Sequence, residues 1–427
     1  MRVLLINQYY YPDIAATAQL CQDWAEDLVE LGHEVTVLAG TARYRLPHRG
    51  EQAEPAAQQR LPLRATHGGV RIVRVPVLSG GGDSAAARLL RRGGGYVSFL
   101  GGALLALWAV ERPDVVVALS TPPMVAALGL GAQAGLGAGF VFWVQDVYPE
   151  LLVALGVLSP TSPITRGLAA LARALYRRAD RIIALDEAMA ERLVAAGAAA
   201  ERVRVIDHFC DTDEIRPQPP ALNPLRQRLG LRDEFLVCYA GNHGRCHDFD
   251  TVLAALAQQA AAGDTALHWL FVGDGEQRQR LVAGVPPALR RVVHLLPPQA
   301  RAELPQVLSA GSVGLVTLKA ELAGLVAPSK LYGLLSAGCP VVYVGPRRGR
   351  IPELLATEAV GVALDNGDAT GLLQALHRLR ADAPARAAMA ARARTLAVTR
   401  YDRPRSTAAH AALLTEVADE RAARPQP

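Results

Sequence analysis

Hydrophobic residues along the chain fall in short uninterrupted runs that alternate with longer segments of helical periodicity. Val3–Ile6 is a continuous apolar run, which is the pattern of a strand buried on both faces. The next segment places apolar residues on one face and acidic residues on the other, which predicts an amphipathic helix. Its apolar face is formed by Cys21, Trp24, Leu28 and Leu31. Gly32 is expected to end this helix, and Glu34–Ala39 predicts a second strand parallel to the first.

The strand–helix unit recurs in two series. Further strands of the first series are expected at Val70–Val77, Val115–Leu119, Phe140–Val144, Arg181–Leu185 and Arg202–Ile206. Strands of the second series are expected at Phe235–Ala240, Leu267–Val272, Val292–Leu296, Ser312–Leu318 and Pro340–Val344. Loops are expected at 41–66, Gly80–Gly82 and Gly93–Gly95. This alternation predicts parallel sheets covered by helices.

The chain divides at a segment rich in proline. Residues 207–234 contain four prolines and little periodicity, so they are expected to join two domains at 1–206 and 235–395. A helix in 396–427 is expected to pack back toward the first domain and to end in a tail. The predicted fold class is therefore α/β, with two facing, doubly wound, Rossmann-like domains. Such sheets bind ligands at the carboxyl ends of their strands, which predicts a site in the cleft between the domains.

Composition narrows the class of protein. A chain of 427 residues with 51% hydrophobic residues suits two globular domains. The net charge is +5, but no stretch combines basic and aromatic residues, so no nucleic-acid partner is expected. Five scattered cysteines and an N-terminus without signal-peptide features favour a cytoplasmic protein. The uncharged run Val115–Gln145 is broken by prolines and glycines, which favours buried core over a membrane span.

Several motifs occur in a fixed order along the chain. They are RVLLINQYYYPDIAATAQL, FVFWVQDVYPELLVALGVL, YAGNHGRCHDFDTVL, WLFVGDGEQRQRL and APSKLYGLLSAGCPVVYVGP. Together they resemble glycosyltransferases of family 4 with the GT-B fold, in a bacterial branch related to the fucosamine transferases of surface-polysaccharide synthesis. The resemblance implies retaining transfer from a nucleoside-diphosphate sugar, with no metal and no cofactor. It implies a donor bound mainly by the C-terminal domain and an acceptor bound mainly by the N-terminal domain.

The departing diphosphate determines which residues the chemistry requires. Negative charge develops on this group, and fixed cations with free backbone N–H groups stabilise it. By the resemblance, Arg245 and Lys330 are the expected cations and are counted with the catalytic residues. Other expected donor-binding residues in these loops are Gly241, Asn242, Gly244, Pro328, Ser329 and Leu331. Pro328 and Ser329 also suit the start of a helix.

Asp146 follows a predicted strand of the first domain. It is the third catalytic candidate, as a partner of acceptor or sugar hydroxyls or as a base, and the alternative is an N-cap of the next helix. Gln145 occupies the position of a histidine in many relatives and is able to hydrogen-bond a sugar hydroxyl. Tyr11 and Asp13 are the other expected acceptor-binding residues. Ala15 and Ala16 stand where relatives often have glycine, and Thr17 is expected as an N-cap.

Further donor contacts are expected in the second domain. Gly273, Asp274 and Gly275 follow a strand, although Asp274 alternatively caps a helix. Pro298 lies in the segment 294–299, which resembles a turn that reads the base. Gly333 replaces the glutamate that usually binds ribose, and Gly324 or Leu325 stands near an earlier one, so Glu353 or backbone groups are expected to take over. Arg347, Arg348 and Arg350 either add phosphate contacts or form an exposed turn.

Competing chemistries remain open at this point. Asp211–Asp213 has the D-x-D spelling of metal-dependent transferases, and His243, Cys246 and His247 share a loop, but neither set suits a metal site. No metal-binding residue is therefore predicted. A nucleotide-sugar epimerase and a non-catalytic nucleotide-sugar-binding protein are the alternative functions. Arg88, Arg91 and Arg92 precede the uncharged stretch Tyr96–Val110. This pattern fits either a core helix or peripheral contact with the inner face of the membrane, which would favour a lipid-linked over a soluble saccharide acceptor.

Overall fold

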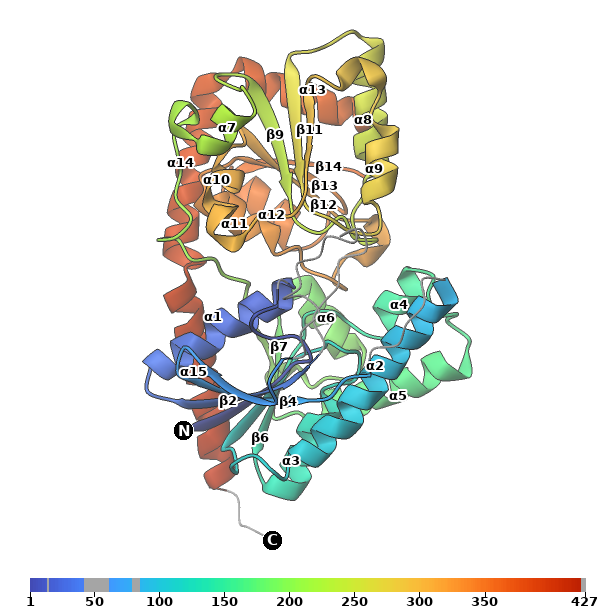
Figure 1. Cartoon of the computed structure of the whole chain (residues 1–427), viewed down its shortest axis with the longest axis vertical. Helices are drawn as coiled ribbons and strands as arrows, with labels where there is room; N and C mark the ends of the chain where they lie inside the picture. The colour runs from blue at the N-terminus through green and yellow to red at the C-terminus, as the bar shows by residue number, and fades with distance from the viewer. Residues whose placement is uncertain (14, 42–60, 79–84, 424–427) are drawn as a thin grey trace.

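The structure is a computed structural model that describes the chain except for residues 14, 42–60, 79–84 and 424–427 and the side chains of 85–92. Two lobes lie one above the other, each built on a mainly parallel sheet (Figure 1). The chain passes once from the lower, N-terminal lobe to the upper lobe, and its last helices return along the side of the molecule. This arrangement confirms the predicted pair of Rossmann-like domains.

The N-terminal lobe contains an eight-stranded sheet in the order β3-β4-β2-β1-β5-β6-β7-β8. Its strands are β1 (Arg2–Ile6), β2 (Glu34–Gly40), β3 (Arg64–His67), β4 (Val70–Val75), β5 (Val115–Ala118), β6 (Gly139–Trp143), β7 (Arg181–Ala184) and β8 (Val203–Val205). Its helices are α1 (Ala16–Glu30), α2 (Ala85–Ala106), α3 (Ala127–Leu136), α4 (Glu150–Ala154), α5 (Pro163–Arg178) and α6 (Glu187–Ala195). All strand pairs are parallel except β3–β4.

The C-terminal lobe contains a six-stranded parallel sheet in the order β11-β10-β9-β12-β13-β14. Its strands are β9 (Phe235–Ala240), β10 (Leu267–Val272), β11 (Val293–Leu296), β12 (Val313–Thr317), β13 (Val341–Val344) and β14 (Gly361–Leu364). Its helices are α7 (Pro224–Arg228), α8 (Asp250–Ala261), α9 (Arg278–Gly284), α10 (Leu304–Ser309), α11 (Lys330–Ser336), α12 (Arg350–Thr357) and α13 (Ala369–Ala381), with α14 (Ala383–Arg400) and α15 (Arg403–Ala422) closing the chain. Single 3-10 turns are Ala200–Arg202, Pro220–Leu222, Pro287–Leu289, Arg301–Glu303 and Ala320–Leu322.

Several local expectations were wrong. Within the segment 41–66, residues 42–60 lie outside the description, but the stretch that follows contains β3, which pairs with β4 as an edge strand. Gly93–Gly95 lies inside α2 rather than in a loop. Helix α2 buries Phe99 and Ala103 in the core, and this packing outweighs the low helix propensity of glycine. Gly80–Gly82 lies outside the described residues. Strand β14 was missed because three of its four residues are only partly buried.

Helix α1 follows its predicted pattern. The buried residues Cys21, Trp24 and Leu28 face the sheet, and Gly32, with a φ of +84°, allows the left-handed turn that ends the helix. The helix begins at Ala16 with Ala15 as N-cap, so the expected N-cap Thr17 lies within the first turn. Leu31 is 54% exposed, because it lies beyond the last helical residue.

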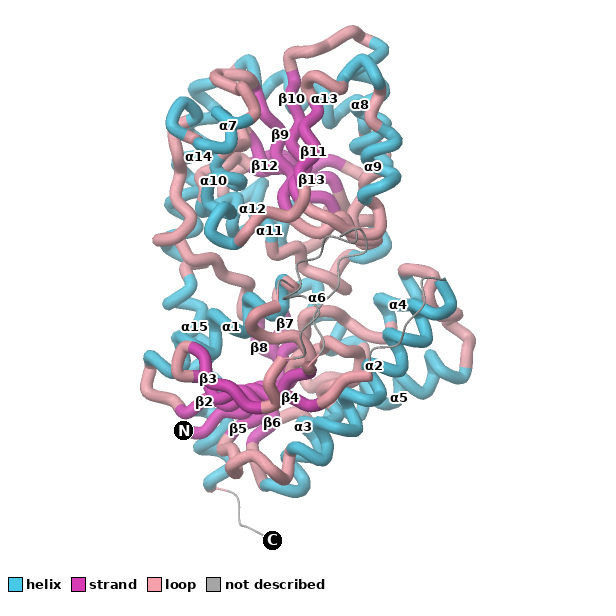
Figure 2. The backbone as a smooth tube through the Cα atoms, viewed as in Figure 1, coloured by secondary structure: helices cyan, strands magenta, loops and turns pink. Residues whose placement is uncertain are grey.

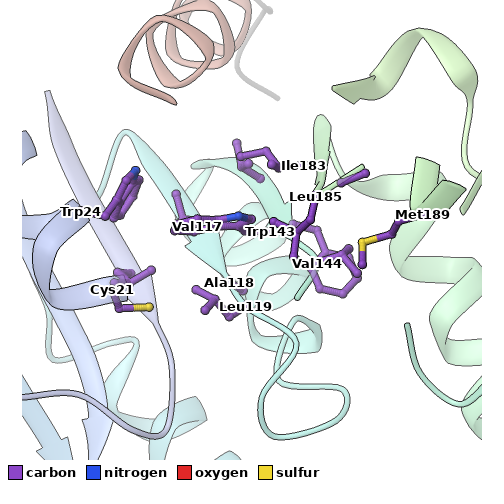
Figure 3. Packing of buried hydrophobic residues seen from close by; sticks show 14 of the residues in the cluster. Cys21, Trp24, Val117, Ala118, Leu119, Trp143, Val144, Ile183, Leu185 and Met189 are labelled. Atoms are coloured by element: carbon purple, nitrogen blue, oxygen red, sulfur yellow. The ribbon is translucent and has the colours of Figure 1, made fainter. Parts of the chain in front are cut away.

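The core of the N-terminal lobe also includes the last helix of the chain. Trp24 of α1 and Trp143 of β6 have ring centroids 5.4 Å apart, and Figure 3 shows both rings among the apolar ends of neighbouring strands. The His410 ring of α15 lies 4.6 Å from that of Trp143. Its Nδ1 donates to the Ser406 carbonyl at 2.8 Å, and burial lowers its pKa to about 4. Helix α15 is thus an integral layer of the N-terminal lobe, and the residue 395 boundary falls inside α14.

A cluster of charged residues joins the two lobes beside the linker. Arg403 of α15 forms ion pairs with Asp23 and Asp27 of α1. Arg301 of the C-terminal lobe also pairs with Asp23, at 2.9 Å. The Arg403, Asp23 and Asp27 side chains are each about 15% exposed, so solvent screens these pairs less than ordinary surface pairs. This cluster fixes α1 against both the returning helix and the upper lobe.

Candidate active site

The carboxyl ends of the strands in the C-terminal lobe meet the N-terminal lobe. Figure 2 shows the loops that follow these strands gathered between the two sheets. Strand β9 has β10 on one side and β12 on the other, so the chain reverses its winding direction between β9 and β12. Open α/β sheets bind ligands at such a switch point. Tyr239 at the end of β9, Thr317 at the end of β12 and Lys330 at the start of α11 converge there.

Lys330 occupies this switch point. Its Nζ donates to the Tyr239 hydroxyl at 3.0 Å and lies 3.1 Å from Nε2 of His247. Nζ also lies 4.5 Å from the centroid of the Tyr239 ring. Within the described chain, no carboxylate lies within ion-pair distance of this amino group. Burial lowers the pKa of Lys330 to about 7, because the charged form loses hydration that no opposite charge replaces.

Main-chain carbonyls fix the partners of Lys330. His247 Nδ1 lies 2.7 Å from the carbonyl oxygen of Thr317. A carbonyl oxygen only accepts hydrogen bonds, so Nδ1 carries the proton and Nε2 is left as an acceptor facing Lys330. The Tyr239 hydroxyl donates to the Asn242 carbonyl at 2.8 Å. It therefore also presents a lone pair to Nζ. Burial lowers the pKa of His247, and Lys330 lowers it further, which keeps the imidazole neutral.

The predicted donor glycines bring two loops into close contact. A Cβ atom at Gly273 would lie 2.0 Å from the Gly241 carbonyl oxygen, and one at Gly275 would lie 2.5 Å from Asn242 Oδ1. His243 N donates to the Asp274 carbonyl at 2.8 Å. All three glycines, at 241, 273 and 275, have φ between +134° and +154°, a region that glycine favours. The structure therefore explains them by contact between loops, independently of any ligand.

Other residues of these loops have structural partners. Asp274 is buried and its Oδ1 accepts from the N–H of Gly275, while α9 begins after Gln277, so Asp274 does not cap that helix. Gly244 accepts from Gln277 Nε2 at 2.6 Å through its carbonyl. Asn242 is exposed at the rim. Pro298 follows β11, next to Gly273, whose N–H donates to the Leu296 carbonyl.

Arg245 lies further from the switch point. Its side chain is 50% exposed, and its Nε lies 3.8 Å from a carboxylate oxygen of Glu276. Its Nη2 donates to the Leu155 carbonyl at 3.1 Å. Leu155 belongs to the N-terminal lobe, so this arginine reaches across the cleft. Arg245 and Lys330 therefore border the same loop but have separate partners.

Pro328, Ser329 and Leu331 surround Lys330 in sequence. Ser329 is exposed, Pro328 is half-buried and Leu331 is 1% exposed. The Leu331 side chain belongs to the hydrophobic core, so a ligand has access only to its main chain. Ser329 is the N-cap of α11 by position, but its side chain forms no cap hydrogen bond.

Asp146 faces the cleft from the N-terminal lobe. Its N–H and that of Gln145 both donate to Ser120 Oγ at 3.0 Å. Val147 N donates to the Leu325 carbonyl of the other lobe at 3.0 Å, which places the segment directly on the cleft. Burial raises the pKa of Asp146 to about 6, and the hydrogen bond from Tyr148 opposes this. Pro149 is the N-cap of α4, so Asp146 has no capping role.

Cys246 interacts electrostatically with both ionisable groups. Its thiol is within electrostatic range of Asp146 and Lys330, and burial raises its pKa to about 11. Asp146 lines a small pocket with Tyr148, together with Phe142 and Tyr176 from β6 and α5.

The remaining acceptor candidates lie deeper in the N-terminal lobe. Gln145 is 5% exposed, and its Nε2 has no hydrogen-bond partner among the described residues. Tyr11 stacks on His67, with ring centroids 3.5 Å apart. Asp13 is 7% exposed, and its Oδ1 accepts from the N–H of Ala15 at 3.0 Å.

The position expected for a ribose-binding carboxylate has little free space. A Cβ atom at Gly333 would lie 2.9 Å from Leu308 Cδ1, so a side chain there would have to displace the end of Leu308 in α10. At Gly324 a Cβ atom would lie 2.7 Å from the Ala188 carbonyl, and the neighbouring Leu325 is buried. Glu353 is exposed on α12.

The arginines of the basic loop 347–350 form ion pairs, so the loop is not an isolated exposed turn. Arg347 pairs with Asp365 at 2.8 Å within the C-terminal lobe. Arg348 pairs with Glu191 of α6. Arg350 pairs with Glu187 of α6 at 2.8 Å and with Asp207 of the linker at 2.9 Å. This loop therefore joins the lobes on the side of the cleft formed by α6.

No cluster of three potential metal ligands occurs in the part of the chain that the structure describes. Asp211 Oδ1 accepts from the N–H groups of Asp213 and Glu214, and Thr212 donates to Asp402. The D-x-D spelling is thus explained by a local turn. His243 is completely buried among aromatic rings, and burial lowers its pKa to about 3.

Sequence reasoning missed the two residues that contact the Lys330 amino group. Tyr239 reads as one apolar position of β9, and His247 as one member of a doubtful metal loop. Their proximity to Lys330 depends on contacts between positions 83 and 91 residues apart. The only local signal is a pair of polar side chains flanking the glycine loop after a buried strand.

Two families match the chain in succession. Residues 16–207 match the family described as "Glycosyl transferase 4-like domain", and residues 234–382 match "Glycosyl transferases group 1". The chain is 26% identical over 364 residues to the Escherichia coli protein named "Putative colanic acid biosynthesis glycosyl transferase WcaI", covering 84% of this chain and 86% of that protein. It is 29% identical over 280 residues to the Pseudomonas aeruginosa protein named "Probable glycosyltransferase WbjE", covering 64% and 68%.

Solved structures of the same fold cover nearly the whole chain. Sucrose-phosphate synthase from Thermosynechococcus elongatus superposes with a TM-score of 0.77 at 16% identity, covering 98% of this chain and all of that one. HepE of Anabaena, solved in complex with UDP and glucose, superposes with a TM-score of 0.71 at 18% identity, covering 97% and 100%.

Proposed function

Because the chain belongs to the GT-B glycosyltransferases that join a 4-like domain to a group 1 domain, we propose that it transfers a sugar from a nucleoside-diphosphate sugar. The acceptor is a saccharide or a lipid-linked saccharide. The transfer retains the anomeric configuration and uses no metal ion or other cofactor. The donor lies on the C-terminal lobe at the end of β9, and the acceptor lies on the N-terminal lobe near Asp146.

One observation carries this proposal: the Lys330 amino group has no anionic partner among the residues that the structure describes. Its two hydrogen-bond partners are neutral, and it sits at the switch point of the sheet. Buried charges in proteins are normally paired with opposite charges. A diphosphate group supplies the missing negative charge. Arg245, half-exposed on the loop that follows β9, adds a second cation at the mouth of the site.

The proposed reaction follows from these positions. The acceptor hydroxyl attacks the anomeric carbon while the bond from that carbon to the phosphate oxygen breaks. The phosphate oxygen of the leaving group takes the bonding electron pair and accepts the proton of the attacking hydroxyl, and Lys330 and Arg245 stabilise the negative charge that the diphosphate acquires. Asp146, when ionised, accepts a hydrogen bond from the attacking hydroxyl and orients it. These two cations replace the charge that a metal ion supplies in other transferases.

The relatives support a role in polysaccharide assembly. One relative is named for colanic acid biosynthesis, and one structural neighbour was solved with UDP-glucose. We infer from them a nucleotide-sugar donor and a growing surface polysaccharide as the acceptor. An experiment first has to identify the nucleotide base and the sugar of the donor.

A panel of nucleotide sugars tests the function directly. The protein is incubated with radiolabelled UDP-, GDP- and dTDP-sugars, with and without a metal chelator and a saccharide acceptor. Transfer or slow hydrolysis of one donor, unaffected by the chelator, is expected. A changed sugar on an intact diphosphate would identify an epimerase instead. Tight binding with no turnover of any donor would identify a non-catalytic binding protein.

A lipid-linked acceptor also requires contact with a membrane surface. No helix in the described part of the chain has the length and apolarity to cross a bilayer. Helix α2 and the turn after it, however, expose Val97, Leu105 and Trp108, each by more than 60%. Helix α3 contacts both α2 and α5, and α5 has exposed arginines, including Arg166 and Arg173, and no acidic residue. An apolar ridge beside arginines suits the surface of an anionic bilayer at the inner face of the membrane.

Sedimentation with lipid vesicles tests this contact. Binding to vesicles that contain phosphatidylglycerol is expected, with little binding to pure phosphatidylcholine, and Leu105→Asp is expected to weaken it about tenfold. Equal recovery of wild type and variant in the supernatant would reject membrane contact. A wild-type dimer that the variant abolishes would assign the ridge to self-association instead.

A further inference from the structure

Lys330 is unusual in a chain whose lysine and arginine residues are almost all arginines. The sequence contains only two lysines, Lys319 and Lys330, while the other 43 of its 45 basic residues are arginines (45 − 2 = 43). Arginine stays charged at any pH that a protein experiences, whereas a buried lysine is able to lose its proton. Lys330 is therefore one of only two side chains among the lysines and arginines whose charge is adjustable.

The two neighbours of the amino group are fixed in their hydrogen-bonding roles. His247 gives its only N–H to the Thr317 carbonyl, and Tyr239 gives its O–H to the Asn242 carbonyl. Each therefore presents an acceptor to Nζ, at 3.1 Å and 3.0 Å. Both acceptors are neutral, so they orient the amino group without supplying a negative charge.

Resting on the proposed function, we propose that His247 and Tyr239 are positioning residues that hold two N–H groups of Lys330 and leave the third for the donor diphosphate. Binding of the diphosphate is then coupled to protonation of Lys330. The free site holds an amino group that is partly neutral near pH 7, and the bound phosphates favour the ammonium form. One proton is taken up from solvent by Nζ, and no covalent bond changes.

Other titratable groups face Lys330 from the elements packed around it. Cys246 and His243 belong to the same loop as His247, and Tyr239 belongs to β9. Burial raises the pKa values of Cys246 and Tyr239 and lowers that of His243. All three are therefore neutral around pH 7, so the only group in this set that changes charge near neutral pH is Lys330 itself.

Trace acetylation measures the proton on Lys330 directly. A small amount of acetic anhydride reacts with the neutral amine, and mass spectrometry of the peptides quantifies labelling of Lys330 against Lys319 across a pH series. The expected labelling curve for Lys330 lies near pH 7 in the free protein and moves to higher pH with saturating UDP or GDP. Calorimetry of UDP binding in two buffers of different ionisation enthalpy counts the proton uptake independently of reagent access.

Three variants separate positioning from general packing. His247→Leu and Tyr239→Phe remove one acceptor each, so the free-protein curve is expected to move to lower pH and kcat to fall about tenfold, with a smaller change in KM. His247→Gln retains an acceptor and is expected to restore most of the rate. His243→Leu removes a buried ring of the same loop whose nitrogens have no hydrogen-bond partner among the described residues, and it is expected to leave both readouts unchanged.

The outcomes distinguish failure of the proposed function from failure of the positioning role. If neither UDP nor GDP shifts the labelling of Lys330 or produces proton uptake, the diphosphate does not bind there and the proposed function itself fails. If a nucleotide shifts the labelling but His247→Leu and Tyr239→Phe behave like His243→Leu, the positioning role is overturned while the donor site stands. Failure of His247→Gln to recover any activity beyond His247→Leu would also overturn it.

Discussion

The two sides of the cleft hold their ionisable groups in opposite ways. Lys330, in the C-terminal lobe, has two neutral acceptors that are themselves fixed by carbonyl groups. The carboxyl group of Asp146, in the N-terminal lobe, accepts a single hydrogen bond from the described residues, from the Tyr148 hydroxyl at 3.4 Å. Burial lowers the pKa of the lysine to about 7 and raises that of the aspartate to about 6. Each shift is toward neutrality, because neither group has an opposite charge beside it.

The difference indicates which side is preorganised. A lysine held by two fixed acceptors loses little entropy when a phosphate arrives, so the donor side is ready before binding. The carboxyl group of Asp146 lines a small pocket and has one long hydrogen bond, so its final orientation depends on the acceptor. We therefore expect removal of the Lys330 amino group to have a larger effect on rate than removal of the Asp146 carboxylate.

Removal of the donor-side cation is expected to have the largest effect. Lys330→Ala should lower donor turnover about 100-fold, since a charge-assisted contact to the departing diphosphate contributes about 1.5–3 kcal/mol. Lys330→Arg keeps a charge that does not titrate, so the fall in kcat/KM as pH rises through about 7 should disappear. Steady-state kinetics across pH measure both effects. A Lys330→Ala enzyme within threefold of wild type would contradict the comparison.

Loss of the acceptor-side carboxylate should cost less. Asp146→Asn is expected to lower kcat about 30-fold, because the amide orients a hydroxyl more weakly than a carboxylate does. Asp146 is protonated below its pKa of about 6 and ionised above it, so wild-type kcat/KM should rise with pH through about 6. The Asn variant should lack this limb. An unchanged acid limb in the variant would assign it to another group.

Arg245 tests whether exposure reduces the contribution of a cation. Arg245→Ala should lower turnover about tenfold, less than Lys330→Ala, since a half-exposed guanidinium acts through a solvent-screened field. Arg290→Ala serves as the control, because this exposed arginine precedes β11 at the opposite end of the sheet. Equal losses in the Arg245 and Lys330 variants would show that burial does not separate the two cations.

Substitution of a residue that joins the lobes should have the smallest effect. Arg350→Ala removes the ion pairs to Glu187 and Asp207, and we expect about a threefold loss in kcat/KM, since partly exposed pairs contribute about 0.2–1 kcal/mol. High salt should mimic the variant in wild type and add little to it. A loss as large as that of Arg245→Ala would indicate that the loop contacts the donor.

Much of the architecture was predictable because it depends on local patterns. Apolar runs such as Val3–Ile6 and Phe235–Ala240 must be buried on both faces, so they specify parallel strands wherever they pack. The two series of strands and the proline-rich segment 207–234 between them are also local patterns, and they predicted two lobes. Gly93–Gly95 was misread because a propensity is a weak local term that burial of Phe99 in α2 outweighs.

The candidate site likewise has a part that local patterns predicted and a part that they did not. Lys330 and Asp146 were identified from short motifs that follow predicted strands, and a strand end has a known place in a parallel sheet. The partners of Lys330, the close contact of Gly241 with Gly273, and the ion pairs of Arg348 and Arg350 with α6 were not predictable. Each joins residues that are far apart in the chain, and only the packing of loops and lobes brings them within a few ångströms. Short motifs along the chain identify the residues that carry the chemistry. The neighbouring groups that set the pKa of each residue come together only when the chain has folded.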